Sequence, residues 1–281
     1  MFKVVGVIGA GQMGSGIAHV FAQHAYQVLI YDISEAQLEK ALKSIEQNLE
    51  RQAKKGVIFS TSIQGIMGRI GVTKDLNDFS ACDLVVEAVN ENEALKFDLF
   101  RKLDGIVGKD AILASNTSSI SITRIAAVTG RPDKVIGMHF MNPVPIMQLV
   151  EVIRGLATSE ETFNSISSLV SKLGKEMAVS QDYPGFIVNR ILIPMINEAV
   201  FALYEGIATV EDIDKGMKLG TNQPMGPLTL ADFIGLDTVL AIANVLYDGF
   251  KEPKYRPCPL LVKMVNAGYL GKKSGRGFYT Y

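Results

Sequence analysis

The stretch KVVGVIGAGQMGSGIAHVFAQHAYQVLIYD, residues 3–32, contains three elements in the order strand, helix, strand. Residues 3–8 form a β-branched apolar run that is typical of a buried parallel strand. A helical pattern follows, and a second apolar run then ends at Asp32. This order within about 30 residues predicts a β-α-β unit, in which a crossover helix joins two parallel strands.

A glycine-rich loop, GAGQMG, joins the first strand of this unit to its helix. In a G-x-G-x-x-G pattern the first glycine permits a tight turn, the second lets the backbone approach a pyrophosphate, and the third lets the helix pack closely on the strand. Turns commonly need glycine, so the pattern alone is weak, but here it follows a strand and opens a helix. The loop predicts a bound dinucleotide, contacted by Gly9, Gly11, Gln12, Met13 and Gly14.

Asp32 ends the second strand, 18 residues after Gly14. An acid at that place binds the ribose hydroxyls of adenosine, and its carboxylate repels a 2′-phosphate. The residue therefore predicts NAD(H) rather than NADP(H) as the cofactor. The alternatives are structural: the glycines form an ordinary turn, and Asp32 is an acid at the entry of the next helix.

Apolar runs continue to alternate with helical patterns beyond this unit. A polar helix is predicted over residues 34–55, with Ser34 as its N-cap and Gly56 as its stop. A second helix near 60–69 pairs with it, so a helical hairpin is inserted at about 34–70. Further strands are predicted at 82–89, 111–116 and 134–140, and further helices at 92–104 and 121–128. The order predicts an α/β fold with a Rossmann-type, doubly wound, mostly parallel sheet.

The alternation stops after the segment YPGFIVNRILIPMINEAVFAL. Proline and glycine interrupt regular elements, so Tyr183-Pro184-Gly185 is the predicted joint. We expect a Rossmann-type domain at residues 1–184 and an all-helical domain at 185–281. The helical domain is expected to close the substrate cleft and to form a homodimer interface, although its amphipathic segments could equally be internal core.

The composition excludes several classes of protein. The 281 residues are 48% apolar, and the net charge of −1 supplies no basic field for nucleic acid or an anionic membrane. Two cysteines, Cys82 and Cys258, are too few for a disulfide framework, and their spacing indicates no metal site. No apolar run is long enough to span a bilayer, and the N-terminus lacks signal-peptide features, so we expect a cytoplasmic protein.

The segment GMHFMNPVPIMQLVEV, residues 137–152, is mostly apolar yet contains His139, one of three histidines, and Glu151. We expect it to form a strand, a turn and a second strand. A lone histidine in apolar sequence is commonly a hydrogen-bonded structural residue. From the residues alone, a structural and a catalytic histidine both remain open.

Six motifs, in order over essentially the whole chain, resemble those of the L-3-hydroxyacyl-CoA dehydrogenase family. They are VIGAGQMGSGIA, DLVVEAVNEN, LASNTSSISI, GMHFMNPVPIMQLVEV, PGFIVNRILIPMINEA and GKKSGRGFY. Within the family the similarity is strongest to the single-function bacterial (clostridial-type) members of butyrate-forming anaerobes. The resemblance implies an NAD(H)-dependent oxidoreductase that interconverts (S)-3-hydroxybutyryl-CoA and acetoacetyl-CoA.

The resemblance also implies the catalytic residues. His139 is the general acid and base, and Glu151 fixes its tautomer and stabilises the imidazolium. Ser118 donates to the substrate oxygen and contacts the cofactor, although Ser118, Ser119 or Ser121 can instead cap the following helix. Asn189 orients the substrate, with a buried structural amide as the alternative.

Further positions match residues that contact the two large ligands in the family. Asn142, Glu91, Lys96 and Lys273 are implied to contact the cofactor, and Asn48, Arg51, Lys54 and Lys55 to hold the adenine and 3′-phosphate of CoA. The alternatives are an Asn-Pro turn at Asn142, solvated charges, and a basic helix end that complements the helix dipole. Asn48 stands where relatives can have serine, which makes that contact less secure.

Two other functions remain open. The same fold and His139–Glu151 pair could serve a 3-hydroxy acid without CoA, such as a sugar acid or carnitine, although the basic helix face argues against it. A non-enzymatic, crystallin-like relative is disfavoured because the pair is intact.

Overall fold

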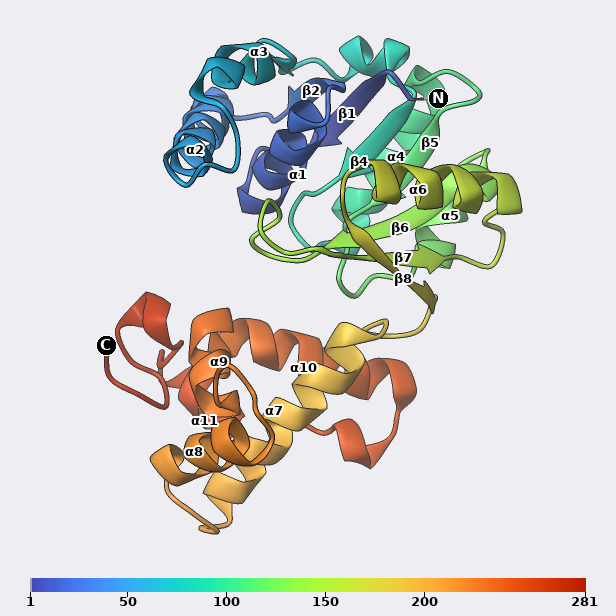
Figure 1. Cartoon of the computed structure of the whole chain (residues 1–281). Coiled ribbons are helices and arrows are strands. Elements are labelled where there is room, and N and C mark those ends of the chain that lie inside the picture. The colour runs from blue at the N-terminus through green and yellow to red at the C-terminus, as the bar shows by residue number, and fades with distance from the viewer. Residues whose placement is uncertain (1) are drawn as a thin grey trace. The chain divides into compact units, whose positions relative to one another are not determined.

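The computed structural model describes residues 2–281 and divides the chain into two compact units, Met1–Tyr183 and Pro184–Tyr281. The first unit is built on an eight-stranded sheet with the strand order β3-β2-β1-β4-β5-β6-β7-β8 (Figure 1). The strands are β1 (Val4–Ile8), β2 (Gln27–Tyr31), β3 (Ile70–Thr73), β4 (Leu84–Glu87), β5 (Ile112–Ser115), β6 (Val135–Phe140), β7 (Leu149–Arg154) and β8 (Glu176–Gln181).

All neighbouring strands pair in parallel except β6 and β7, which are antiparallel. The helices of the first unit flank the sheet and are α1 (Gln12–Gln23), α2 (Glu35–Lys54), α3 (Ile63–Met67), α4 (Glu93–Ile106), α5 (Ile122–Ala126) and α6 (Glu160–Lys172). The predicted mostly parallel, doubly wound sheet is therefore confirmed. Its strand order reverses direction between β1 and β4, and ligands of such sheets bind where this reversal occurs.

The hairpin of α2 and α3 shows how the sequence determines a local element. Ser34 caps α2, because its hydroxyl oxygen accepts a hydrogen bond from the backbone N–H of Gln37 at 3.4 Å. The apolar residues recur every three or four positions, and their side chains are buried: Leu38, Ala41, Ile45 and Leu49. Gly56 follows the helix with a φ of +71°, a conformation that glycine adopts without strain.

Three elements of the first unit were not expected from the sequence: β3, α6 and β8. Both β3 and β8 lie at the edges of the sheet, where the side chains are mostly half-exposed or exposed. Such strands lack both the continuous apolar run of a central parallel strand and the strict alternation of a half-buried one.

The second unit is helical, as predicted. Its helices are α7 (Val188–Tyr204), α8 (Val210–Gly220), α9 (Pro227–Ile234), α10 (Leu236–Phe250) and α11 (Pro259–Asn266). Their apolar faces share one core, which includes Ile196, Leu228 and Val239. The buried carboxylate of Asp232 accepts hydrogen bonds from the backbone N–H groups of Phe278 and Tyr279, both at 2.9 Å, and so fastens the C-terminal segment to α9.

Over residues 2–281, none of the helices is by itself long and apolar enough to cross a membrane. One bent pair, α9 with α10, meets the length and composition criteria together, with a bend of 99° at its break.

One buried histidine, His19, makes the fold sensitive to acid. It lies on α1 and is 0% exposed, and burial, the largest influence, lowers its pKa from 6.5 to about 4. The nearby charges of Lys175 and His24 act in the same direction. His19 is therefore neutral in the folded chain at neutral pH.

We expect acid to destabilise the protein through His19. The unfolded chain takes up this proton near pH 6.5 and the folded chain only near pH 4, so the free energy of unfolding falls between these values. The difference corresponds to about 3 kcal/mol. Denaturant unfolding between pH 7 and pH 4 should show a smaller loss in His19→Gln than in the wild type. His24→Gln, at the exposed C-cap of α1, should show a loss closer to that of the wild type, because it removes only a small influence on His19. Equal losses in all three proteins would contradict the assignment.

Candidate active site

The glycine loop has the geometry that a pyrophosphate requires. Gly9 has a φ of +99°, and a Cβ there would lie 2.6 Å from the carbonyl oxygen of Ala88. A Cβ on Gly14 would lie 1.7 Å from the carbonyl oxygen of Gly9, so helix and loop meet backbone to backbone. A Cβ on Gly11 would project into open space in front of α1. Only glycine fits at positions 9 and 14, and Gly11 leaves the N–H groups of the helix accessible to an anion.

Asp32 holds this loop from the end of β2. Its Oδ2 accepts a hydrogen bond from the backbone N–H of Ala10 at 2.9 Å, and its Oδ1 accepts one from Ser34 at 2.9 Å. Met13 packs partly buried against the core below the loop. The loop, the helix start and the acid therefore form one unit at the carboxyl ends of β1 and β2, and this unit fits a dinucleotide.

Gln12 connects the glycine loop to the turn after β6. Its Nε2 donates to Oδ1 of Asn142 at 3.0 Å, although the two residues are 130 positions apart in the chain. Asn142 precedes Pro143 in a cis peptide bond, at the start of the turn that leads from β6 to β7. Two predicted cofactor-contacting residues are thus adjacent in the structure.

His139 and Glu151 are brought together by strand pairing. They are direct partners in the antiparallel ladder of β6 and β7, so their side chains lie on the same face of the sheet. The Nδ1 atom of His139 lies 2.7 Å from Oε2 of Glu151. The carboxylate is fully buried and the imidazole nearly so. A hydrogen bond in such a dry environment is stronger than one in water.

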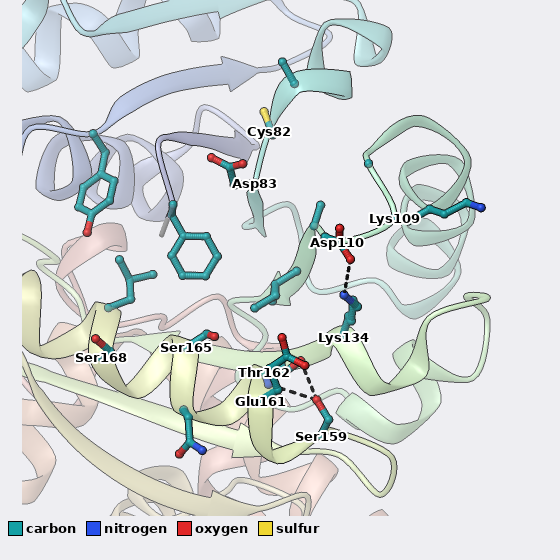
Figure 2. A pocket seen from close by; sticks show the side chains of 18 of the residues that line it. Cys82, Asp83, Lys109, Asp110, Lys134, Ser159, Glu161, Thr162, Ser165 and Ser168 are labelled. Carbon is teal, nitrogen blue, oxygen red and sulfur yellow. Dashed lines mark hydrogen bonds and ion pairs between the residues drawn. The ribbon is translucent and has the colours of Figure 1, made fainter.

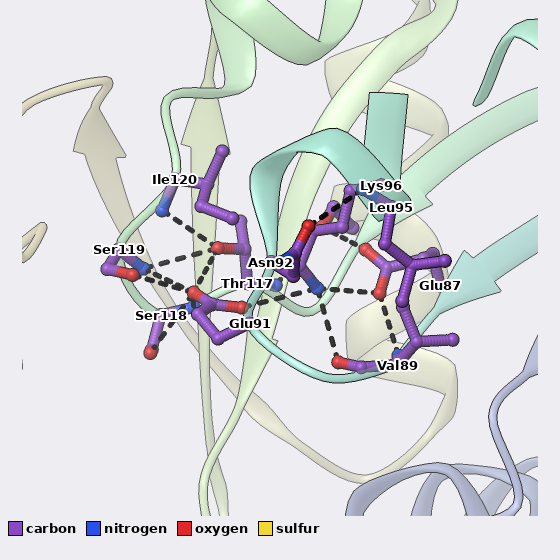
Figure 3. A network of polar contacts seen from close by, with 11 residues as sticks. Glu87, Val89, Glu91, Asn92, Leu95, Lys96, Thr117, Ser118, Ser119 and Ile120 are labelled. Atoms are coloured by element: carbon purple, nitrogen blue, oxygen red, sulfur yellow. Dashed lines mark hydrogen bonds and ion pairs between the residues drawn. The ribbon is translucent and has the colours of Figure 1, made fainter. Parts of the chain in front are cut away.

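A network of polar groups surrounds the loop that carries Ser118, and Figure 3 shows its members. Oε1 of Glu91 accepts hydrogen bonds from the backbone N–H groups of Ser118 at 2.9 Å and Ser119 at 3.0 Å. The hydroxyls of Thr117 and Ser119 also donate to this oxygen, at 2.5 and 2.8 Å. One carboxylate therefore determines the shape of the serine loop.

Lys96 lies between two carboxylates of this network (Figure 3). Its Nζ atom is 2.6 Å from Oε1 of Glu87 and 3.2 Å from Oε2 of Glu91, and its side chain is 1% exposed. Burial opposes ionisation of Glu91, but the charge of Lys96 and the hydroxyls of Thr117 and Ser119 outweigh it, so the pKa of Glu91 lies below its usual range. Lys96 is thus directed into the protein rather than toward solvent.

Two residues that complete this arrangement were missed by the sequence analysis. Glu87 is fully buried and also accepts a hydrogen bond from the hydroxyl of Ser115 at 2.7 Å. An acid inside the apolar run LVVEAV was the signal that could have identified it. Asn116 accepts a hydrogen bond from the backbone N–H of Phe140 at 2.9 Å, which joins the serine loop to the strand of His139.

The capping role among the serines belongs to Ser121. Its hydroxyl oxygen accepts from the backbone N–H of Arg124 at 3.2 Å, at the start of α5. Oδ2 of Asp182 in turn accepts from the hydroxyl of Ser121 at 2.7 Å. Ser118 and Ser119 instead belong to the Glu91 network.

The two predicted residues of the helical unit have different surroundings within it. Asn189 lies in the first turn of α7 and is buried. Lys273 lies near the C-terminus, where its Nζ atom donates to Oδ2 of Asp237 at 2.7 Å, and both side chains are about half-exposed.

The helical hairpin of the first unit presents the predicted basic cluster. Asn48 and Arg51 are adjacent on α2, with Nη1 of Arg51 donating to Oδ1 of Asn48 at 3.1 Å. Lys54 and Lys55 are exposed at the end of the helix. Lys54 borders a hollow of about 840 Å³ that the turn after α2 also lines, and Phe59 in this turn is 82% exposed. Basic and aromatic groups thus share one solvent-facing site.

A second hollow, of about 820 Å³, lies at the amino ends of the strands, whereas the glycine loop lies at their carboxyl ends (Figure 2). It is lined by residues that precede β4, β5 and β6, including Asp83, Asp110 and Lys134, and by the polar face of α6. The hollow is therefore separate from the cofactor-binding edge.

Comparison with known proteins agrees with this arrangement. Residues 4–183 match the family described as 3-hydroxyacyl-CoA dehydrogenase, NAD binding domain, and residues 185–281 match the C-terminal domain of the same family. A 3-hydroxybutyryl-CoA dehydrogenase of Bradyrhizobium diazoefficiens is 55% identical over 281 residues, covering 100% of this chain and 96% of the relative. A 3-hydroxybutyryl-CoA dehydrogenase of Clostridioides difficile is 49% identical and covers 98% of each chain.

A solved structure gives the same result. The crystal structure of (S)-3-hydroxybutyryl-CoA dehydrogenase from Ralstonia eutropha has a TM-score of 0.98 and 51% identity, and the match covers 100% of this chain and 99% of that one. The resemblance that the sequence motifs indicated is confirmed. The predicted cofactor, NAD(H), agrees with the description of the matched domain as NAD-binding. The chain belongs to the 3-hydroxyacyl-CoA dehydrogenase family.

Proposed function

We propose that the protein is an NAD(H)-dependent dehydrogenase that interconverts (S)-3-hydroxybutyryl-CoA and acetoacetyl-CoA. The observation that carries this proposal is the 2.7 Å contact between Nδ1 of His139 and a buried oxygen of Glu151. The glycine loop with Asp32 supports the cofactor, and the relatives named 3-hydroxybutyryl-CoA dehydrogenase support the substrate.

The dyad accounts for the proton that leaves the alcohol. Oxidation at C3 removes a hydride and the hydroxyl proton, and the bound nicotinamide supplies the hydride acceptor. Glu151 holds the Nδ1–H of His139, so Nε2 is the atom that takes the proton and later returns it. The carboxylate stabilises the imidazolium that forms. In the reducing direction the same imidazolium protonates the oxygen at C3.

The other predicted residues act around this proton transfer. Ser118 donates to the oxygen at C3 as negative charge develops, and Glu91 fixes the loop that presents it. Asn142, close to the glycine loop, serves the nicotinamide side of the cofactor. Lys96 supports the cofactor site indirectly. Its Nζ atom is buried between two carboxylates, so it holds Glu91 in place rather than contacting the cofactor itself. Asn189 orients the substrate and Lys273 serves the cofactor.

The basic end of α2 is proposed to hold the CoA handle. Arg51, Lys54 and Lys55 offer charge for the 3′-phosphate, and the exposed Phe59 offers an aromatic face for the adenine. This site distinguishes an acyl-CoA from a free 3-hydroxy acid, which is the alternative substrate. It does not distinguish one acyl chain from another.

The chain is further proposed to act as a cytoplasmic homodimer. Cys82 and Cys258 are buried and unpaired, which supports a reducing compartment. The helical unit exposes large apolar side chains, such as Ile191, Ile207 and Leu219, which supports a subunit interface there. Cell fractionation and the sedimentation mass test the two proposals, and a membrane fraction or a single-chain mass would contradict them.

Initial rates of the purified wild type test the function. With NADH we expect turnover of acetoacetyl-CoA and little of free acetoacetate. With NADPH, kcat/KM should fall by about tenfold or more, because the carboxylate of Asp32 repels the 2′-phosphate. Equal rates for free acetoacetate would favour the CoA-free alternative. No turnover of either substrate would contradict the proposed function.

Replacing the proposed base tests the mechanism. His139→Gln should retain the NADH dissociation constant of the wild type but lose about a hundredfold or more in kcat, because the proton loses its acceptor. Fluorescence titration measures the first quantity and steady-state kinetics the second. A near-normal kcat would remove His139 from the mechanism.

Charge reversal tests the CoA handle. The double variant Arg51→Glu, Lys55→Glu should raise KM for acetoacetyl-CoA by about tenfold or more and leave KM for NADH nearly unchanged, because only the acyl-CoA loses its phosphate contacts. The matched control is Lys40→Glu, Lys43→Glu, with the same charge change at exposed positions of the same helix. A similar rise of KM for acetoacetyl-CoA in both double variants would indicate a general electrostatic effect of the helix charge rather than a binding site.

A further inference from the structure

The turn between β6 and β7, residues 141–148, links the two members of the dyad. It leaves the strand of His139, passes Asn142, and returns to the strand of Glu151. Inside the turn, the backbone N–H groups of Ile146 and Met147 both donate to the carbonyl oxygen of Pro143 at 3.0 Å. Other carbonyl groups of the turn need partners from elsewhere in the protein.

Lys175 supplies these partners from a different part of the chain. Its Nζ atom donates to the carbonyl oxygens of Val144 and Met147, both at 2.7 Å. It stands just before β8, after Gly174 with a φ of +62°. No carboxylate of residues 2–281 forms an ion pair with Lys175. The partly buried ammonium group of Lys175 thus donates hydrogen bonds to two backbone oxygens of one turn.

The same turn also packs against the cofactor-binding unit. Val144 is buried against α1, where a Cβ on Gly16 would lie 2.9 Å from the Cβ of Val144. Gln12, at the start of the same helix, bonds the side chain of Asn142. The turn is therefore held by Lys175 through its backbone and by α1 and Gln12 through the side chains of Val144 and Asn142.

We propose that Lys175 is a positioning residue for cofactor binding. By holding Val144 and Met147 it keeps the turn against α1 and keeps Asn142 beside the glycine loop. Lys175 does not touch the dyad, because His139 and Glu151 are paired by the strand ladder itself. The contribution of Lys175 should therefore appear in cofactor affinity rather than in proton transfer. This inference rests on the proposed function only through the role of Asn142.

The experiment compares three variants: Lys175→Met, Lys175→Arg and Lys172→Met. Met removes the donor and keeps the length of the stem, whereas Arg keeps a cation that can donate to two carbonyl oxygens. Lys172 is the matched control, because it is an exposed lysine at the end of α6. The measurements are the NADH dissociation constant by fluorescence titration, KM for NADH and for acetoacetyl-CoA, and Tm.

Lys175→Met should weaken NADH binding by about tenfold, since two hydrogen bonds to a charged group are lost. KM for acetoacetyl-CoA should stay within about twofold of the wild type, Lys175→Arg should recover part of the NADH affinity, and Lys172→Met should match the wild type. An unchanged NADH dissociation constant in Lys175→Met would overturn the proposal. So would a lower Tm accompanied by equal losses for both substrates and no recovery with Arg.

The two proposals fail in different ways. Absence of acetoacetyl-CoA turnover in the wild type would refute the proposed function, whereas the NADH dissociation constants of the variants would still test Lys175. Conversely, an active wild type with an unaltered Lys175→Met variant would refute only the positioning role.

Discussion

In the ladder between β6 and β7, His139 and Glu151 face each other, and their contact follows from backbone hydrogen bonding rather than from the reach of two side chains. A shift of register by one residue would turn one of them to the other face of the sheet. The remaining parts of the candidate site depend on this register. Asn116 bonds the backbone of Phe140, next to His139, and the following turn brings Asn142 to the glycine loop. The pairing of two strands therefore determines where the serine loop and the cofactor loop meet the proposed base.

The charges near the serine loop are arranged so that none is isolated. Lys96 lies between Glu87 and Glu91, and removal of Lys96 would leave the fully buried carboxylate of Glu87 without its cation. The same carboxylate of Glu91 that balances Lys96 also accepts the N–H groups of the serine loop. The shape of this loop and the neutralisation of Lys96 are therefore coupled.

Local features of the sequence predicted the fold and part of the site. The glycine loop, Asp32 and the capped helix α2 were predicted because each depends on residues within a few turns of one another. The edge strands β3 and β8 were not predicted, because their mostly half-exposed or exposed side chains show no strong hydrophobic periodicity. The partners of Lys175 could not be derived, because its two contacts join segments 31 and 28 residues apart in the chain and depend on how these segments pack together. For Lys96 the sequence could suggest a solvated charge or a cofactor contact, and only the fold shows that it is buried between two acids.

The carboxylate of Asp32 accepts the N–H of Ala10 with one oxygen and that of Ser34 with the other. This double use constrains any redesign of the protein toward a 2′-phosphorylated cofactor. An asparagine there would remove the charge, but its NH₂ group would face one of the two backbone donors instead of an acceptor. The glycine loop would lose a tether together with the repulsive charge. A useful redesign must therefore keep two acceptor atoms at this position, or provide another acceptor for Ala10, and introduce the positive charge from a neighbouring residue.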